Sequence, residues 1–371
     1  MAATGTARVL VVNAGSSSLK LRVLGGDDAV SASADLPAPR GATDGAAIKA
    51  AIESFGPVDA VGHRVVHGGT LYAEPVLITG EVRRRLETLT DLAPLHQPKS
   101  LAALDAVSEV LPSVPAVACF DTAFHATIGD AAATYALPAE WRARWTLRKY
   151  GFHGLSHSYA SRRAAELLRR SVDGMRVVTC HLGAGASLAA VHSGRSVDTT
   201  MGFTPLDGLV MATRSGSVDP GLVLWLEEHA GTPSAELAAT LEYRSGLTGL
   251  AGTGDMREVL SRAAAGDTRA VLGREVYLHR LRALIAAMAA AMDGLDVLVF
   301  TGGVGENSAE VRSRAAIGLG FLGVRLDESR NAADSDADRD IGADGAPVRA
   351  FVIPAREDKQ IAAEVRSVLN L

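Results

Sequence analysis

The chain lacks several features that define whole classes of protein. It has only 2 cysteines among 371 residues, and neither a CxxC pair nor a Cys/His cluster occurs, so we expect no disulfide framework and no zinc site. It also has no basic surplus, because 37 basic residues face 42 acidic ones and the net charge is −5. Nucleic acids and anionic membranes select basic surfaces, so this charge argues against both as partners.

Long hydrophobic runs are missing as well. The first run covers residues 9–12 and leads directly into the polar stretch NAGSSS, so it is too short for the core of a signal peptide. The longest apolar helical stretch covers residues 283–292, whereas a helix needs about 20 residues to cross a bilayer. We therefore expect a soluble, cytoplasmic protein in which this stretch belongs to a buried helix.

The chain does have the repeating pattern of an α/β protein. Hydrophobic residues make up 47% of its 371 residues, a length that corresponds to about two domains. Strand-like runs alternate with helical periods, as is typical of α/β folds. Two segments, residues 9–24 and 177–192, share the order apolar run, Gly/Ser turn, apolar run. This similarity predicts an internal duplication, with a cleft between the two halves.

Further elements follow from local periodicity. Apolar runs and helical spacing predict strands within residues 58–66, 114–121, 296–301 and 348–355, and helices within residues 98–111, 273–295 and 356–369. Residues 25–50 and 331–347 are rich in Ala, Asp and Gly, and we expect them to be surface segments.

Three glycine-containing turns suit phosphate binding. Residues 13–20, NAGSSSLK, place small residues between two strands, where backbone N–H groups and Lys20 attract an anion. An ordinary polar hairpin is the alternative, and a Walker A loop is excluded because Lys20 enters a strand. Residues 181–187, HLGAGAS, form a second such turn. Residues 302–307, GGVGEN, open a helix whose N-terminus attracts anions, but Ser308 breaks the GxGxxG fingerprint.

Four side chains stand at positions typical of active sites. Arg64 ends an apolar strand and suits a bidentate clamp on a carboxylate or phosphate, with a surface ion pair as an equal alternative. Asp121 follows a strand, where α/β active sites lie, but a helix N-cap is the simpler local explanation. His153 lies among glycines and aromatics before a helix, and Arg214 lies in a Gly/Ser loop. A packed loop histidine and a solvated arginine are the alternatives for these two.

Together these residues provide what phosphoryl transfer requires, namely positioning of phosphates and neutralisation of their charge. No GxSxG elbow and no flavin or nicotinamide fingerprint competes with this interpretation. The ordered motifs resemble those of acetate kinases: VLVVNAGSSSLK, GHRVVHGG, LAPLHQP, FDTAFH, RKYGFHGLSH, HLGAGAS, DTTMGFTPLDGLVMATRSGSVDP, DMRE and FTGGVGENS.

The resemblance implies two duplicated α/β domains of the actin, Hsp70 and sugar kinase type, with RNase H-like cores and an interdomain nucleotide cleft. Residues 1–122 and 355–371 would form the first domain. Residues 123–354 would form the second, which binds nucleotide and mediates dimerisation. The implied reaction transfers the ATP γ-phosphoryl group to acetate or another short-chain carboxylate, with Mg²⁺ or Mn²⁺, in a cytoplasmic homodimer.

The resemblance also implies roles for single residues. Catalysis would involve Asp121, His153 and Arg214, and the metal would be held through Asn13 and Glu357. Arg64 would bind the acetate carboxylate, while an apolar pocket for its methyl group would consist of Val66, Leu95 and Pro205. Nucleotide contacts would come from Ser16, Ser18, Lys20, His181, Leu182, Gly183, Ala184, Gly185, Asp255, Met256, Arg257, Gly303, Val304, Gly305, Glu306 and Asn307.

Two positions depart from the usual family pattern. Ala184 stands where most members have asparagine, which removes one potential hydrogen bond, and Glu357 lies in AREDKQIA where many members have TNEExxIA.

Three alternatives stay open. The apolar pocket would also suit a propionate or butyrate kinase. Ala184 is the one feature that favours a nucleotide-binding regulatory paralogue without turnover, against which the retained Arg64, Asp121, His153 and Arg214 argue. An ATPase or chaperone of the same fold is the third alternative, and it would not need Arg64.

Overall fold

The computed structural model describes residues 7–15, 18–37, 44–94 and 96–371. Their contacts divide the chain into two units, each described by itself below. Unit 1 contains the described residues up to Ala126, together with Phe152–Tyr159 and Arg356–Leu371. Unit 2 contains Thr127–Gly151 and Ala160–Ala355. The last 16 residues thus belong with the beginning of the chain.

Unit 1 is built on one mixed sheet of six strands in the order β3-β2-β1-β4-β6-β5. The strands β1, β4 and β6 run parallel, while β1, β2 and β3 form an antiparallel meander and β5 is antiparallel to β6. Their bounds are β1 Val9–Ala14, β2 Ser18–Leu24, β3 Val30–Pro37, β4 Ala60–Val65, β5 Val76–Leu77 and β6 Ala116–Phe120. The predicted strands of this half are confirmed.

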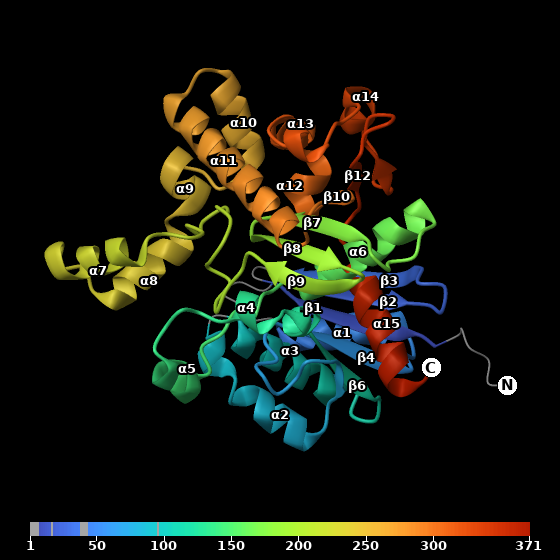
Figure 1. The fold of residues 1–371 in the computed structure, drawn as a ribbon. Coiled ribbons are helices and arrows are strands. Elements are labelled where there is room, and N and C mark those ends of the chain that lie inside the picture. Colours follow the sequence, from blue (N-terminus) through green and yellow to red (C-terminus); the bar gives the residue numbers. More distant parts are fainter. Residues whose placement is uncertain (1–6, 16–17, 38–43, 95) are drawn as a thin grey trace. The chain divides into compact units, whose positions relative to one another are not determined.

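The central strand β1 is apolar throughout because helices cover both of its faces. Val9 and Val11 pack with Ile361 and Val365 of helix α15 (Glu357–Leu369), which lies along one face of the sheet in Figure 1. Leu10 and Val12 pack on the opposite face against α1 (Gly45–Phe55) and α3 (Gln97–Val110). Unit 1 also contains α2 (Gly80–Glu87) and the short η2 (Thr90–Leu92).

Most described residues of 25–50 are exposed, as expected of a surface segment, but the sequence did not predict the two elements that they form. Residues 30–37 form strand β3, and helix α1 begins at Gly45. Strand β3 lies at the edge of the sheet and pairs only with β2, so its side chains are largely exposed and its sequence VSASADLP carries no apolar run. Hydrophobic periodicity does not reveal such a strand, because an edge strand can pair its backbone with a neighbour without burying apolar side chains.

Unit 2 repeats the same topology. Its sheet has the order β11-β12-β10-β7-β8-β9, with β7, β10 and β12 parallel, β7, β8 and β9 antiparallel, and β11 antiparallel to β12. The bounds are β7 Arg176–Leu182, β8 Ala186–His192, β9 Arg195–Thr199, β10 Val297–Thr301, β11 Arg339–Asp340 and β12 Arg349–Val352. The one-to-one match of strand order and direction confirms the predicted duplication.

Helices surround this second sheet. The predicted long helix is confirmed as α11, which packs on β7 and β8 and buries Leu281 and Ile285 among other apolar residues. No helix of the described chain combines the length and hydrophobicity that a bilayer span requires. The other helical bounds are α4 Asp130–Ala133, α5 Ala139–Trp145, α6 Gly154–Leu168 (its first turn in unit 1), α7 Pro220–His229, α8 Ser234–Tyr243, α9 Gly246–Ala251, α10 Met256–Ala264, α11 Thr268–Ala290, α12 Gly302–Asn307, α13 Ala309–Ile317, η4 Gly320–Leu322 and α14 Glu328–Ala332, with η3 Ala123–Thr127 at the junction of the units.

Candidate active site

Polar residues gather where the parallel strands of unit 1 end. Asn13 is the next-to-last residue of β1, Arg64 the next-to-last of β4, and Asp121 directly follows β6. Since parallel neighbours end at the same edge of a sheet, these three side chains lie together at the edge where α/β proteins place their active sites.

Arg64 and Asp121 form a bidentate ion pair. Arg64 donates from Nε to Asp121 Oδ1 at 2.9 Å and from Nη2 to Asp121 Oδ2 at 2.6 Å. The two side chains are only 15% and 2% exposed, so neither charge is well solvated. The structure therefore assigns Arg64 to a buried pair instead of a surface one, and Asp121 to this pair instead of a helix N-cap.

Burial and charge act on the two partners differently. Burial alone would lower the pKa of Arg64, but the carboxylates of Asp121 and Glu357 outweigh it and raise that pKa above its usual range. For Asp121, burial and the neighbouring Glu357 raise the pKa, and Arg64 opposes that shift. The guanidinium stays charged, and its presence favours the charged form of the Asp121 carboxyl against burial.

Glu357 joins this group from the first residue of α15. Its Oε2 accepts a hydrogen bond of 2.7 Å from Asn13 Nδ2 and lies 3.9 Å from Arg64 Nη1. Arg64 Nη1 also donates to Asn13 Oδ1 at 3.1 Å. The result is a network of four residues from four different segments, all within unit 1.

A backbone hydrogen bond next to His153 holds this residue at the same edge of the sheet. The next residue, Gly154, donates its N–H to the carbonyl of Asp121 at 2.8 Å, which ties the start of α6 to the end of β6. His153 itself has a φ of 58°, in the left-handed region that side chains rarely adopt. Such an outlier costs about 1–3 kcal/mol and is found mainly at functional sites.

Sequence reasoning missed the support for this segment. His125 is 1% exposed, and its Nε2 hydrogen-bonds the carbonyl of Phe152 at 3.0 Å. Its ring also packs edge-on against His157, at a centroid distance of 5.7 Å. The motif FDTAFH contained His125, but no local pattern indicates a partner that is 27 residues away.

The remaining predicted residues of unit 1 have simpler settings. Val66 is buried directly after β4. Lys20 lies opposite Asn13 in the β1–β2 ladder, so the two side chains share one face of the hairpin. Ser18, half-buried, starts β2. Two further predicted residues, Ser16 and Leu95, lie outside the described residues.

In unit 2 the second predicted turn joins strands β7 and β8. His181 and Leu182 end β7, and the turn closes with a hydrogen bond of 3.0 Å from Gly183 N–H to the Gly185 carbonyl. Ala184, at the tip, is exposed, and its carbonyl accepts from the N–H of Ala212. This contact brings the turn next to the loop that carries Arg214.

The third predicted segment, Gly302–Asn307, forms helix α12. Gly302 has a φ of 75°, and a Cβ there would lie 2.9 Å from the Leu182 carbonyl oxygen, so α12 starts directly against the end of β7. The Glu306 carboxylate accepts N–H groups from Gly302 at 2.7 Å and from Ala355 at 2.9 Å. Glu306 thus joins the ends of β10 and β12. Gly303 and Asn307 are exposed, Val304 is half-buried and Gly305 is buried.

A buried arginine holds the other end of α12. Arg312 is 2% exposed and donates from Nη1 to the carbonyls of Gly305 and Glu306, at 2.9 and 2.8 Å. It also donates to the side-chain and backbone oxygens of Asn331, at 2.7 and 2.6 Å. Burial and the positive charge of Arg339 lower the pKa of Arg312 to about 10. Sequence reasoning missed this residue because its partners are neutral oxygens from separate segments.

Arg214 is not the solvated arginine of the alternative interpretation. Its side chain is 16% exposed, and its Nε donates to Glu242 Oε1 at 2.6 Å. Pro205, predicted for the apolar pocket, is half-buried in the loop that follows β9.

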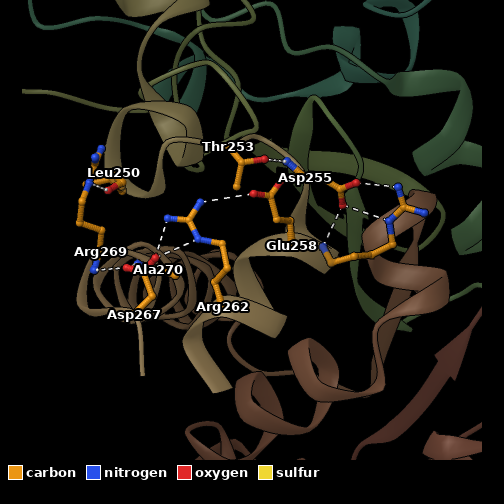
Figure 2. Close-up of polar contacts among 9 residues, drawn as sticks. Leu250, Thr253, Asp255, Glu258, Arg262, Asp267, Arg269 and Ala270 are labelled. Carbon is orange, nitrogen blue, oxygen red and sulfur yellow. Dashed lines mark hydrogen bonds and ion pairs between the residues drawn. The ribbon is translucent and has the colours of Figure 1, made fainter. Parts of the chain in front are cut away.

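Asp255, Met256 and Arg257 begin helix α10. Asp255, labelled in Figure 2, is the N-cap. Its carboxylate accepts from the N–H of Arg257 at 2.9 Å and from the Arg257 guanidinium. These bonds with Arg257 lower the pKa of Asp255 to about 2. Met256 is buried, whereas the Arg257 side chain is 91% exposed. A Cβ on Gly254 would lie 3.1 Å from Ala212, so this segment also adjoins the Arg214 loop.

Two sheets of identical topology, with charged residues at one set of strand ends and glycine turns in the other unit, define a two-domain phosphotransferase of the actin, Hsp70 and sugar kinase fold. The sequence pattern of the acetokinase family matches residues 42–363. The chain belongs to the acetokinase family, and it is therefore a kinase that uses ATP.

Individual relatives agree with this assignment. An acetate kinase from Synechococcus is 51% identical over 314 residues, which cover 84% of this chain and 77% of the relative. One from Leifsonia xyli is 44% identical, with 95% and 97% covered. Among solved structures, Porphyromonas gingivalis acetate kinase is 36% identical with a TM-score of 0.89, covering 98% of this chain and 100% of that one. A Francisella tularensis propionate kinase is 34% identical, with the same TM-score and coverage.

Proposed function

We propose that this protein transfers the γ-phosphoryl group of ATP to acetate and forms acetyl phosphate and ADP, reversibly. The observation that carries the proposal is the network of Arg64, Asp121, Asn13 and Glu357 at the strand ends of unit 1, with His153 tied to it. A buried arginine suits a small carboxylate substrate, because its planar guanidinium can donate to both carboxylate oxygens. The family and its acetate kinase relatives support the same reaction.

In this reaction a carboxylate oxygen of acetate attacks the γ-phosphorus in line with the leaving ADP. Acetate is already ionised at neutral pH, so no residue has to remove a proton from it. Arg64 would bind the acetate carboxylate. Its described contacts use Nε and one N–H each from Nη1 and Nη2, and a guanidinium has five donors. Asp121 would orient Arg64 and the substrate instead of acting as a base.

Positive charge and hydrogen-bond donors must meet the oxygens of the transferring phosphoryl group. We assign this role to Arg214 and His153. Removal of one such donor typically costs about 3 kcal/mol in transition-state stabilisation, or about 100-fold in rate.

The reaction also requires Mg²⁺ or Mn²⁺, which neutralises charge on the phosphate oxygens. The amide oxygen of Asn13 and the carboxylate of Glu357 are the ligand types that Mg²⁺ prefers. No group of three or more His, Cys, Asp or Glu side chains within the described ranges forms a ready metal site. This fits Mg²⁺, which keeps several waters and binds through one or two protein carboxylates plus substrate phosphates.

Most nucleotide contacts would come from unit 2, and Ser16, Ser18 and Lys20 of unit 1 would lie near the phosphates. The turn around Ala184, the exposed Gly303 and Asn307 of α12, and the exposed Arg257 would meet ATP. Glu306 would position this segment through Oε1, which accepts two backbone N–H groups. The domain limits proposed from sequence, residues 1–122 with 355–371 and residues 123–354, stay part of this proposal.

Propionate is the second candidate acceptor, since a propionate kinase is among the similar structures. The residues that would surround the methyl group are Val66, Leu95 and Pro205. An additional methylene in such a pocket changes the preference by only about 1–3 kcal/mol.

We further propose a homodimer in the cytoplasm, where ATP is available. Support for the dimer comes from α7 and α8, which extend away from the sheet of unit 2 in Figure 1. They carry exposed apolar side chains on both helices, Leu222, Leu224, Trp225 and Tyr243, which are 48–57% exposed. Sedimentation velocity would test the dimer, and a monomer at micromolar concentration would refute it.

The activity is tested by incubating the purified protein with Mg-ATP and acetate, propionate or butyrate, and trapping acyl phosphate with hydroxylamine. We expect hydroxamate from acetate or propionate, and a loss of about 100-fold in Arg214→Ala. The ratio between the acids identifies the acceptor. ATP binding without product from any acid would refute the kinase reaction and favour the regulatory paralogue.

A further inference from the structure

We propose that Glu242 is a positioning residue for Arg214: its carboxylate holds the guanidinium in the orientation that meets the transferring phosphoryl group. The inference rests on the proposed function, which gives Arg214 its role. Glu242 lies 28 residues from Arg214 in the chain and contributes to no motif.

The contact is short and shielded. Arg214 Nε donates to Glu242 Oε1 at 2.6 Å, and the side chains are 16% and 13% exposed. A charged hydrogen bond of this length, away from bulk water, is much stronger than a surface ion pair. Arg214 Nη1 also approaches Met211 Sδ at 3.9 Å.

The backbone on both sides of Arg214 is fixed to the same helix end. Thr213 Oγ1 donates to the Glu242 carbonyl at 2.8 Å, and Ser215 N–H donates to the Leu241 carbonyl at 3.1 Å. Ser245 N–H then donates to the Thr213 carbonyl at 2.9 Å. The last turn of α8 therefore holds the backbone of the Arg214 loop, and Glu242 adds the constraint on its side chain.

The position of Glu242 within α8 is unfavourable for a carboxylate taken alone. It is the next-to-last residue of Ser234–Tyr243, where the partial negative charge of the helix C-terminus repels an anion. The pair with Arg214 compensates for that repulsion. A glutamate in this place is thus explained by its partner and not by the helix.

The choice of Nε matters chemically. An arginine grips phosphate oxygens best through its terminal amino groups, which project from the end of the side chain. A carboxylate on Nε restrains rotation at that end and lies on the side of the guanidinium nearest the backbone. Preorganised donors stabilise a transition state more than mobile ones because no reorientation is needed during the reaction.

The alternative role for the same contact is that of an internal counter-ion, in which Glu242 competes with the phosphoryl group for Arg214. The two roles predict opposite kinetics. A positioning residue lowers kcat when it is removed, whereas removal of a competing anion raises kcat.

The test compares Glu242→Ala and Glu242→Gln with the wild type in the hydroxamate assay. We expect kcat to fall at least about 10-fold in Glu242→Ala, with KM for acetate and ATP changed by less than about 3-fold. Glu242→Gln keeps an acceptor oxygen and should retain more activity than Glu242→Ala. The matched control is Glu236→Gln on the same helix, whose exposed pair with Arg244 spans 3.3 Å and should not affect the rate.

A double-mutant cycle then shows whether Glu242 acts through Arg214. In an Arg214→Ala background, Glu242→Ala should cause no further loss. Additive losses, an unchanged kcat or a raised kcat would each overturn the inference. If Glu242→Ala unfolds, as circular dichroism would reveal, the isosteric Glu242→Gln decides by the same criteria. An active wild type with unaffected variants refutes only the role of Glu242, whereas a wild type that forms no acyl phosphate refutes the proposed function as well.

Discussion

The contact between Gly154 and Asp121 offers a sharp test of how the site is held together. Gly154 is the first residue of α6 and donates its N–H to the Asp121 carbonyl. A Cβ added to Gly154 would lie 2.3 Å from that carbonyl oxygen and 2.9 Å from Cβ of Phe124. Both neighbours are rigid, since one is backbone and the other is the first atom of a side chain. Gly154→Ala therefore has to move the start of α6 away from β6.

The size of the movement follows from these distances. Ordinary contact begins at about 3.5 Å, so the two segments have to separate by about 1 Å. His153 would move with the helix start, while Asp121 stays paired with Arg64. A displacement of about 1 Å at a reacting centre costs about 100-fold in rate, and overpacking of this kind costs about 1–3 kcal/mol in stability.

We expect kcat for acyl phosphate formation to fall by about 10- to 100-fold in Gly154→Ala. The control is Gly45→Ala, which changes the first residue of α1, where nothing lies within 4 Å of the new Cβ. Thermal unfolding of both variants separates local displacement from loss of the fold. Wild-type kcat and unfolding temperature in Gly154→Ala would refute the reasoning, because they would mean that this close approach does not position His153.

Three other substitutions test individual features. Burial lowers the pKa of His63 from 6.5 to about 4, so the unfolded chain binds more protons between these values and stability should fall by about 3 kcal/mol from pH 6.5 down to pH 4. His63→Met should lack this part of the acid destabilisation in urea titrations, and an identical pH dependence would contradict the assignment. Arg64→Met leaves the carboxylate of Asp121 buried without its partner and should cost about 3–5 kcal/mol in chemical denaturation; a cost near zero would mean that the pair is solvated. Arg312→Met leaves buried carbonyls at the end of α12 without donors and should cost at least about 2 kcal/mol, whereas an unchanged denaturation midpoint would show that water replaces the guanidinium.

The parts of the fold that could be predicted are those in which the local pattern of apolar and polar residues reflects which side chains are buried. The run Val9–Val12 reads as a strand covered on both faces because every side chain in it is apolar, and the structure places helices on both sides. Strand β3 was not predicted, because it lies at a sheet edge, where small and polar residues can form a strand.

The site was predictable as a set of residues but not as a set of contacts. The strand ends that carry Arg64 and Asp121 are visible in the sequence, yet their pairing joins positions 57 residues apart. Local pattern even favoured a helix N-cap for Asp121. Glu242 gave no signal at all, because what distinguishes it is its distance to Arg214 in space. Contacts of this kind depend on tertiary structure, which periodicity and turn chemistry do not encode.

The placement of α15 has a consequence for synthesis on the ribosome. The core around Val9 and Val11 is completed by Ile361 and Val365, which are translated only after residues 160–355 of unit 2. At about 5–20 residues per second, those residues take about 10–40 s to emerge, and during this time one face of β1 lacks its cover. Unit 2 is then finished before unit 1, although unit 1 begins first. Premature termination within the last helix would therefore leave a complete second unit attached to a first unit whose sheet exposes one apolar face. We expect such a product to be bound by chaperones or to aggregate.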